Sequence, residues 1–181
     1  MKILTTFIKD LLIIEPTVYN DERGYFFESF NKKQFEKLTD RNIDFVQDNE
    51  SKSKYGTLRG LHYQVEPFAQ TKLVRVIKGK VLDIAVDIRE DSETYGKYFS
   101  LELSEDNKKQ LLIPRGFAHG FVVLSQEAIF TYKCDNYYNK NAEGGITFND
   151  KQLNIDWKID LGDIILSEKD KLHPVFGQHK K

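Results

Sequence analysis

The chain has 181 residues, a length that fits one domain, and we expect a single domain over residues 1–181. Its 27 basic and 28 acidic residues give a formal net charge of −1. Such a balance provides no overall field that favours nucleic acid or a membrane surface, so any anion-binding site must be local.

The compartment is indicated by the cysteine count and by the N-terminal residues. The single cysteine, Cys134, cannot form an internal disulfide, which fits a reducing environment. Residues 1–14 are partly apolar, but Lys9 and Asp10 interrupt them, so they predict no signal peptide. No run approaches the roughly 18 apolar residues of a membrane-spanning helix. These features predict a soluble cytoplasmic protein.

The first third of the chain contains the best helix candidate. Residues 11–30 alternate weakly between apolar and polar, with turn residues at 20–24. Residues 31–41 then predict a helix with Asn31 as its N-cap and with Phe35 and Leu38 on one face.

From there the pattern is that of many short strands. The predicted strands are residues 43–49, 57–64, 70–78, 80–88, 97–103, 109–114, 119–124 and 127–135. Gly79 between two of them indicates a hairpin turn, and Asp83 and Asp87 are expected to share a face. A short helical signal follows at residues 167–170. This series predicts an all-β jelly-roll barrel with a few peripheral helices.

Two histidine motifs indicate the type of barrel. Residues 56–64 read Gly-Thr-Leu-Arg-Gly-Leu-His-Tyr-Gln, and residues 114–119 read Pro-Arg-Gly-Phe-Ala-His. They resemble the two half-motifs of a cupin, whose first half normally supplies His-x-His and a Glu as metal ligands. Here Gln64 and Lys72 stand at the second His and the Glu. Because a lysine puts positive charge where the cation would sit, we expect a metal-free pocket for an anionic substrate.

The alternation around His62 predicts a polar barrel interior. Residues 58, 60, 62 and 64 are expected on one face of their strand, with residues 59, 61 and 63 on the other. Polar groups inside a small barrel are unfavourable unless they are paired or serve a ligand, which favours a functional His62. His119 and Tyr132 each fit a structural or a functional reading. Arg23 and Arg59 become phosphate candidates if they line the pocket.

A set of motifs in order along the chain resembles one family of epimerases. The motifs are Asp-x-Arg-Gly-x-Phe-x-Glu at 21–28, Phe-Val-Gln-Asp-Asn at 45–49, Leu-Arg-Gly-Leu-His-Tyr-Gln at 58–64, Gln-x-Lys-Leu-Val-Arg-Val at 70–76, Ile-Pro-x-Gly-Phe-Ala-His-Gly-Phe at 113–121, Tyr-Lys at 132–133, Glu-x-Gly-Ile at 143–146 and Ser-x-Lys-Asp at 167–170. Together they resemble the dTDP-4-dehydrorhamnose 3,5-epimerase family over roughly residues 10–170.

The resemblance implies a cofactor-free homodimer that acts on dTDP-4-dehydro-6-deoxy-D-glucose and inverts C3 and C5. It implies that His62 is the general base, Asp170 its orienting partner, Tyr132 the proton donor on the opposite face and Lys72 the stabiliser of the enolate. It also implies ten substrate-binding residues: Arg23, Phe26, Glu28, Gln47, Asn49, Arg59, His119, Tyr138, Glu143 and Lys169. Tyr138 would stack on the thymine, and the arginines would lie near the diphosphate.

Other functions stay open at this point. One alternative is an epimerase that acts on a single centre or on another nucleotide-linked 4-keto sugar. A second is a non-catalytic cupin that binds sugar nucleotides, which predicts loss of the base or the donor, although His62 and Tyr132 are both present. A metal-dependent cupin oxygenase is disfavoured by Gln64 and Lys72.

Overall fold

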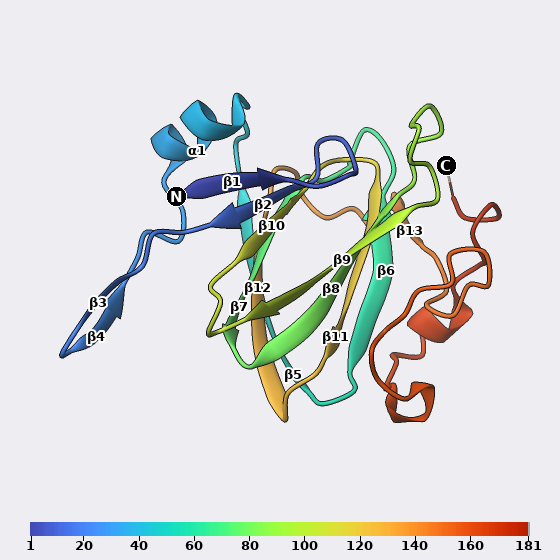
Figure 1. The fold of residues 1–181 in the computed structure, drawn as a ribbon. Coiled ribbons are helices and arrows are strands. Elements are labelled where there is room, and N and C mark those ends of the chain that lie inside the picture. Colours follow the sequence, from blue (N-terminus) through green and yellow to red (C-terminus); the bar gives the residue numbers. More distant parts are fainter. Residues whose placement is uncertain (181) are drawn as a thin grey trace.

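Two antiparallel β-sheets packed face to face make up the body of the protein (Figure 1). The computed structural model describes residues 1–180. Its elements are β1 (Lys2–Thr5), β2 (Leu12–Glu15), β3 (Tyr19–Asp21), β4 (Gly24–Phe26), α1 (Lys32–Thr39), β5 (Gln47–Lys54), β6 (Leu58–Gln64), β7 (Lys72–Lys78), β8 (Lys80–Asp87), β9 (Tyr98–Ser104), β10 (Gln110–Ile113), β11 (Phe117–Val123), β12 (Glu127–Cys134), β13 (Glu143–Gly145) and the 3₁₀ helices η1 (Leu161–Asp163) and η2 (Asp170–Leu172). The expected all-β jelly roll is confirmed.

The strand order separates the sheets cleanly. One sheet runs β1-β2-β10-β7-β12-β5 and the other β13-β6-β11-β8-β9, while β3 and β4 form a hairpin of their own. Buried apolar side chains of both sheets meet between them, and Phe121 of β11 stacks on Phe130 of β12 with ring centroids 4.2 Å apart. Burial of this apolar surface is the main stabilisation of such a barrel.

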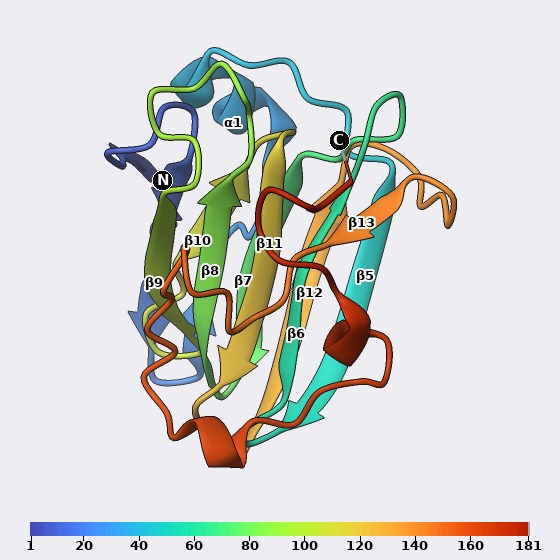
Figure 2. The same ribbon diagram turned by 90° about the vertical axis from the view of Figure 1, so that its right-hand side faces the viewer.

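The C-terminal segment covers the outer face of the five-stranded sheet, as Figure 2 shows. Its buried residues Ile146, Leu153 and Trp157 pack on Leu58 and Leu61 of β6. The indole Nε1 of Trp157 donates a hydrogen bond to the carbonyl of Phe148, so its polar atom is also satisfied. This covering segment later returns to β6, which places residues 165–170 beside the barrel.

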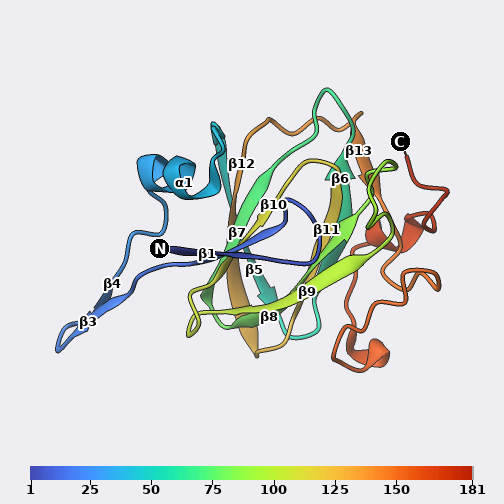
Figure 3. The ribbon, with the colours of Figure 1, turned by 45° about the horizontal axis from the view of Figure 1, so that its top comes forward.

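The hairpin of β3 and β4 projects away from the barrel (Figures 1 and 3). We call residues 19–28 the arm. Tyr25 and Phe26 on the arm are 57% and 66% exposed. The Nζ atom of Lys108 lies 3.9 Å from the centroid of the Tyr25 ring, so the arm also contacts the body of its own chain.

The helix and strand predictions are largely confirmed. Asn31 caps α1, and its side chain accepts a hydrogen bond from the backbone N–H of Gln34 at 3.1 Å. Phe35 is buried, whereas Leu38 is exposed, so only the first of the two faces the core. Every predicted strand exists, although β5 begins at Gln47 and not at residue 43. The short strands β1 to β4 and β13 lie outside the predicted strands.

The predicted hairpin at Gly79 is wrong. β7 pairs with β10 and β12, whereas β8 pairs with β9 and β11, so the turn carries the chain from one sheet to the other. Gly79 has a φ of +77°, a conformation that favours glycine in either kind of turn. A sequence pattern therefore detects the turn and not the sheets that it joins.

The predicted alternation along β6 is also wrong, and the error matters for the site. Leu58 and Leu61 belong to one buried cluster behind the sheet, although Leu58 also borders the cavity that Arg59 and His62 line. The pairing of β6 with β11 shifts register at Gly60. An advance of two residues along β11 there corresponds to three residues along β6. Such a β-bulge turns the preceding side chains to the opposite face. A Cβ on Gly60 would lie 2.5 Å from the Cα of Gly120, so the close approach requires glycine.

No helix among residues 1–180 is both long enough and apolar enough to cross a membrane.

Candidate active site

A cavity of about 570 Å³ lies in the barrel, between walls from both sheets and the C-terminal segment. Its size is typical of a small-molecule site. Eight of the predicted site residues line it: Asn49, Arg59, His62, Lys72, His119, Tyr132, Lys169 and Asp170. The tertiary structure thus brings together all four residues that the resemblance assigns to catalysis.

His62 and Asp170 form a close pair at one wall. The His62 Nε2 and Asp170 Oδ1 atoms are 2.6 Å apart, and Asp170 is 4% exposed. Burial opposes the charge of Asp170, but the hydrogen bonds from His62 and Ser167 outweigh it and lower its pKa. An ionised carboxylate can only accept, so Nε2 of His62 carries the proton. The other nitrogen, Nδ1, therefore holds the lone pair that a base needs.

Tyr132 and Lys72 come from the opposite wall. They lie on neighbouring strands of the six-stranded sheet, and the Lys72 Nζ atom is 6.0 Å from the centroid of the Tyr132 ring. Burial lowers the pKa of Lys72 and raises the pKa of Tyr132. Tyr132 therefore keeps its proton, and its side chain lines the same cavity as His62.

His119 is tied to a buried carboxylate that the sequence did not predict as its partner. His119 pairs directly with His62 across β11 and β6. Its Nε2 atom lies 2.9 Å from Oδ2 of Asp83, which is fully buried. The charge of Asp83 also acts on Lys72, opposing the effect of burial on the pKa of that lysine. Opposite charges in the barrel interior thus compensate one another.

Two polar contacts orient side chains in or beside the cavity. Arg59 Nε donates to the hydroxyl of buried Ser53 at 3.1 Å, which leaves the terminal nitrogens of the guanidinium for an anion. Gln47 Nε2 donates to Oδ1 of Asn49 at 2.8 Å. Gln47, which does not line the cavity itself, is thereby held next to a residue that does.

A second chamber of about 610 Å³ adjoins the first, and Lys169 lines both. Its wall includes Tyr138 and Glu143. Tyr138 donates its hydroxyl to Glu143 at 2.8 Å, and Lys169 forms an ion pair with the same carboxylate. Burial opposes the charge of Glu143, yet these two contacts lower its pKa. The chamber offers an exposed aromatic ring beside fixed charges.

The three predicted residues of the arm are not brought to this site. Arg23 is 85% exposed at its side chain and pairs with Asp21, and Phe26 is exposed as well. Glu28 accepts a hydrogen bond from Asn31 at 2.9 Å. Within one chain these residues lie on the projecting arm and do not line the cavity of His62.

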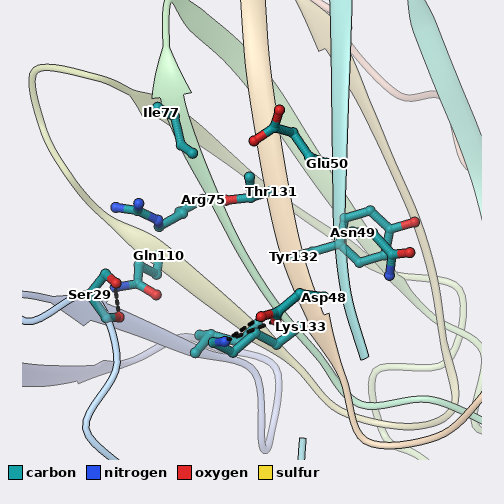
Figure 4. A pocket seen from close by; sticks show the side chains of 11 residues that line it. Ser29, Asp48, Asn49, Glu50, Arg75, Ile77, Gln110, Thr131, Tyr132 and Lys133 are labelled. Atoms are coloured by element: carbon teal, nitrogen blue, oxygen red, sulfur yellow. Dashed lines mark hydrogen bonds and ion pairs between the residues drawn. The ribbon is translucent and has the colours of Figure 1, made fainter. Parts of the chain in front are cut away.

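A smaller pocket of about 330 Å³ lies on the other face of the six-stranded sheet (Figure 4). Lys133 and Asp48 form an ion pair there, and Arg75 packs on the ring of Phe27 at the base of the arm. Asn49, Glu50 and Tyr132 line both this pocket and the cavity of His62. This pocket is therefore a surface beside the arm that shares a wall with the cavity of His62.

One group of three side chains among residues 1–180 has the composition of a metal site. It consists of His62, Asp170 and His173, whose ligand atoms lie within 4.8 Å of one another. Imidazole and carboxylate are ligands that zinc and iron accept. The expectation of a metal-free pocket stays a prediction. His173 was not among the predicted site residues, although its spacing of three from Asp170 in a helical turn could have indicated it.

The fold and the cavity define a class: a cupin-type jelly-roll barrel with a histidine–aspartate pair facing a tyrosine. Comparison with known proteins then gives the family. Residues 5–178 match the family model described as dTDP-4-dehydrorhamnose 3,5-epimerase, and the chain belongs to this family.

Individual relatives agree with this assignment. The chain is 56% identical over 170 residues to the dTDP-4-dehydrorhamnose 3,5-epimerase of Shigella flexneri, covering 94% of this chain and 93% of that one. A crystal structure of this epimerase from Elizabethkingia anophelis has 60% identity and a TM-score of 0.94, covering 98% and 97% of the two chains. A Legionella pneumophila dTDP-6-deoxy-D-glucose-3,5-epimerase in complex with dTDP-4-keto-L-rhamnose has 48% identity and the same TM-score, covering 98% and 93%.

Proposed function

We propose that this protein inverts C3 and C5 of dTDP-4-dehydro-6-deoxy-D-glucose, giving dTDP-4-dehydro-L-rhamnose for dTDP-L-rhamnose biosynthesis. The observation that carries the proposal is the His62–Asp170 pair, which faces Tyr132 from the opposite sheet in a member of this epimerase family. An inversion needs a base on one face of the sugar ring and an acid on the other. Residues 1–181 act as one catalytic domain in this proposal.

Each inversion is a proton transfer through an enolate. Nδ1 of His62 takes the proton from the carbon beside the C4 ketone, and the C–H electron pair moves onto the ketone oxygen. The ammonium of Lys72 stabilises this oxygen, an effect for which loss of one donor typically costs about 100- to 1,000-fold in rate. Tyr132 then gives its proton to the same carbon from the other face. Asp170 balances the imidazolium that forms on His62.

The remaining cavity residues hold the nucleotide part in this proposal. Arg59 binds the diphosphate, since its bond to Ser53 uses Nε and leaves the two terminal nitrogens available. Tyr138 stacks on the thymine in the second chamber, where its ring is 56% exposed. Asn49, His119 and Lys169 orient the sugar between the two walls.

We also propose a homodimer in which the arm of one subunit completes the site of the other. Arg23 and Phe26 are exposed on the arm and lie outside the cavity of their own chain. β5 forms the edge of the six-stranded sheet, and it carries Gln47 and Asn49 beside the cavity. An open strand edge accepts another strand readily, so it offers a place for the partner's arm.

Subunit complementation tests the shared site. Arg23→Ala and His62→Ala are each expected to lose most activity as homodimers. If the arm acts in the partner's site, mixed dimers contain one intact site, and re-associated mixtures recover activity toward a quarter of wild type. If each arm serves its own chain, mixing restores nothing and the shared site is wrong. Analytical ultracentrifugation checks that the species is a dimer.

Proton NMR in D₂O with dTDP-4-dehydro-6-deoxy-D-glucose tests the reaction itself. Deuterium is expected at both C3 and C5, and coupling to a 4-ketoreductase with NADPH is expected to form dTDP-L-rhamnose. Deuterium at one carbon alone would make the protein a single-centre epimerase, and no exchange would favour a binding role. A cytoplasmic location is part of the proposal, supported by the single cysteine Cys134.

A further inference from the structure

A second histidine lies against the proposed base, and the chemistry above gives it no role. The rings of His62 and His173 meet edge to face, with centroids 5.2 Å apart and an angle of 88°. Nε2 of His173 is 3.9 Å from Oδ1 of Asp170, the same oxygen that bonds to His62. One carboxylate oxygen therefore faces two imidazoles.

The backbone fixes the place of His173. Gly145 on β13 pairs with His62 on β6, so the strand that carries Gly145 runs beside the base. A Cβ at Gly145 would collide with the ring of His173, and glycine is what leaves room for that ring. Thr147 donates its backbone N–H to the carbonyl of Pro174 at 2.8 Å, which anchors the segment just after His173.

Packing alone does not account for an imidazole at this position. The side chain of His173 is 9% exposed, and its Nδ1 atom is buried without a hydrogen-bond partner. A buried polar atom without a partner typically costs about 1–3 kcal/mol. An apolar side chain of similar size would avoid that cost, so the ring is better explained by what it does to His62 and Asp170.

Charged and titratable groups face His173 from every neighbouring element. They are His62 on β6, Glu143 on β13, Lys169 just before η2 and Asp170 within it. Burial lowers the pKa of His173, and His62 adds to this effect, while Asp170 and Glu143 oppose it. His173 therefore stays neutral at a pH where an ordinary histidine begins to take up a proton.

We propose that His173 is a positioning residue, a neutral imidazole whose ring holds His62 against Asp170 so that Nδ1 of His62 points at the substrate. When His62 takes the substrate proton, a neutral His173 leaves the whole charge of Asp170 to it. At acid pH a protonated His173 would repel His62 and compete for the carboxylate. The kinetic part of this inference rests on the proposed epimerase function.

Kinetics of three variants test the role. His173→Ala is expected to lower kcat by about 10- to 100-fold with KM within about twofold, because a shift of the base by an ångström can cost that much. His173→Phe retains a ring and is expected to restore most of kcat near neutral pH. Val175→Ala, two residues later and 44% exposed, is the control and should match wild type. Unchanged kcat in His173→Ala, or no recovery in His173→Phe, would overturn the proposal.

The pH profile gives a readout that a merely structural role would not move. As pH falls, wild-type activity is expected to drop more steeply than that of His173→Phe, because His173 can take up a proton beside His62 and Asp170 in wild type, whereas a phenyl ring cannot. If activity falls with decreasing pH in the same way in both enzymes, His173 does not compete with His62 for Asp170.

A spectroscopic test needs no substrate and so separates this inference from the proposed function. The chain has four histidines, so ¹⁵N imidazole spectra are simple to assign by substitution. Neutral His62 is expected to carry its proton on Nε2 in wild type and in His173→Phe, and to show a mixture of both tautomers in His173→Ala. An unchanged tautomer in His173→Ala would show that His173 does not position His62, whichever sugar the enzyme accepts.

Discussion

His62 Nε2 and Asp170 Oδ1 lie 2.6 Å apart although 108 residues separate them in the chain. The base belongs to β6 of the barrel, whereas its partner belongs to the segment that covers the outer face of the sheet. A parallel bridge between Thr57 and Ile165 fastens this segment to the start of β6. The proposed base is therefore completed by a covering element and not by the barrel alone.

Asp170→Asn should remove the orientation of the base while keeping the shape of its partner. An asparagine that turns its amide toward His62 donates to Nε2, so the proton of His62 moves to Nδ1, where the lone pair is required. We expect kcat to fall by about 10³- to 10⁴-fold, the scale seen when the partner of a catalytic histidine is changed in this way. Deuterium exchange at C3 and C5 measures the loss. Glu168→Gln, two residues earlier and exposed, is the matched control, and equal activity of the two variants would contradict the role of Asp170.

Tyr132→Phe should separate proton removal from inversion. The variant keeps His62, so substrate in D₂O should still exchange through the base face, while the product inverted at one or both centres should not form. Exchange by NMR and coupled product formation measure the two steps on one sample. Tyr137→Phe, at an exposed tyrosine outside the cavity, should behave as wild type. Normal product formation by Tyr132→Phe would rule out Tyr132 as the donor.

The decline of kcat at alkaline pH should measure the loss of the proton from Lys72. Burial lowers the pKa of Lys72 and raises the pKa of Tyr132, so rising pH discharges the lysine while the phenol still holds its proton. Activity should therefore decline at a pH below about 10.4, the usual lysine value. Lys72→Ala should lower kcat by about 100- to 1,000-fold with a smaller change in KM, because the charge is needed mostly in the enolate.

Lys72→Arg provides the decisive comparison for this decline. A guanidinium does not lose its proton in this range, so any activity that remains should extend to higher pH than in wild type. If activity declines at the same pH in both enzymes, a group other than Lys72 causes the decline.

Gly145→Ala should destabilise the protein through His173. The added Cβ collides with the imidazole ring, and overpacking of this kind typically costs about 1–3 kcal/mol. His173→Ala in the same chain removes the obstacle, so the double variant should be more stable than Gly145→Ala alone. Denaturant unfolding measures both. Gly162→Ala, where a Cβ meets nothing closer than Asp160 at 3.2 Å, is the control.

Removal of metal should leave turnover unchanged. The proposed steps use an imidazole, a phenol and an ammonium, and Lys72 stands where a cupin carboxylate ligand would be expected. Dialysis against a chelator followed by assay, with metal analysis of the same sample, checks this expectation. Stoichiometric zinc or iron whose removal abolishes activity would instead assign His62, Asp170 and His173 as ligands.

Local sequence signals explain which parts of the fold could be predicted. Apolar runs and turn residues located the strands within a few residues, and the Asn31 cap located α1. The same signals failed at Gly79, because a tight turn does not reveal whether its two strands share a sheet. They failed at Gly60 as well, since a bulge depends on the neighbouring strand β11 and not on the pattern of β6.

The sequence by itself determined the barrel class and the chemical types in the site, because strand periodicity and the motifs around His62, Lys72 and His119 are local features. Only the tertiary structure decided which of these groups meet. It joined Asp170 to His62, Asp83 to His119 and His173 to the first pair. It also placed the arm away from the cavity of its own chain. Such contacts depend on sheet pairing and on the covering of the sheet by distant segments, which no local pattern encodes.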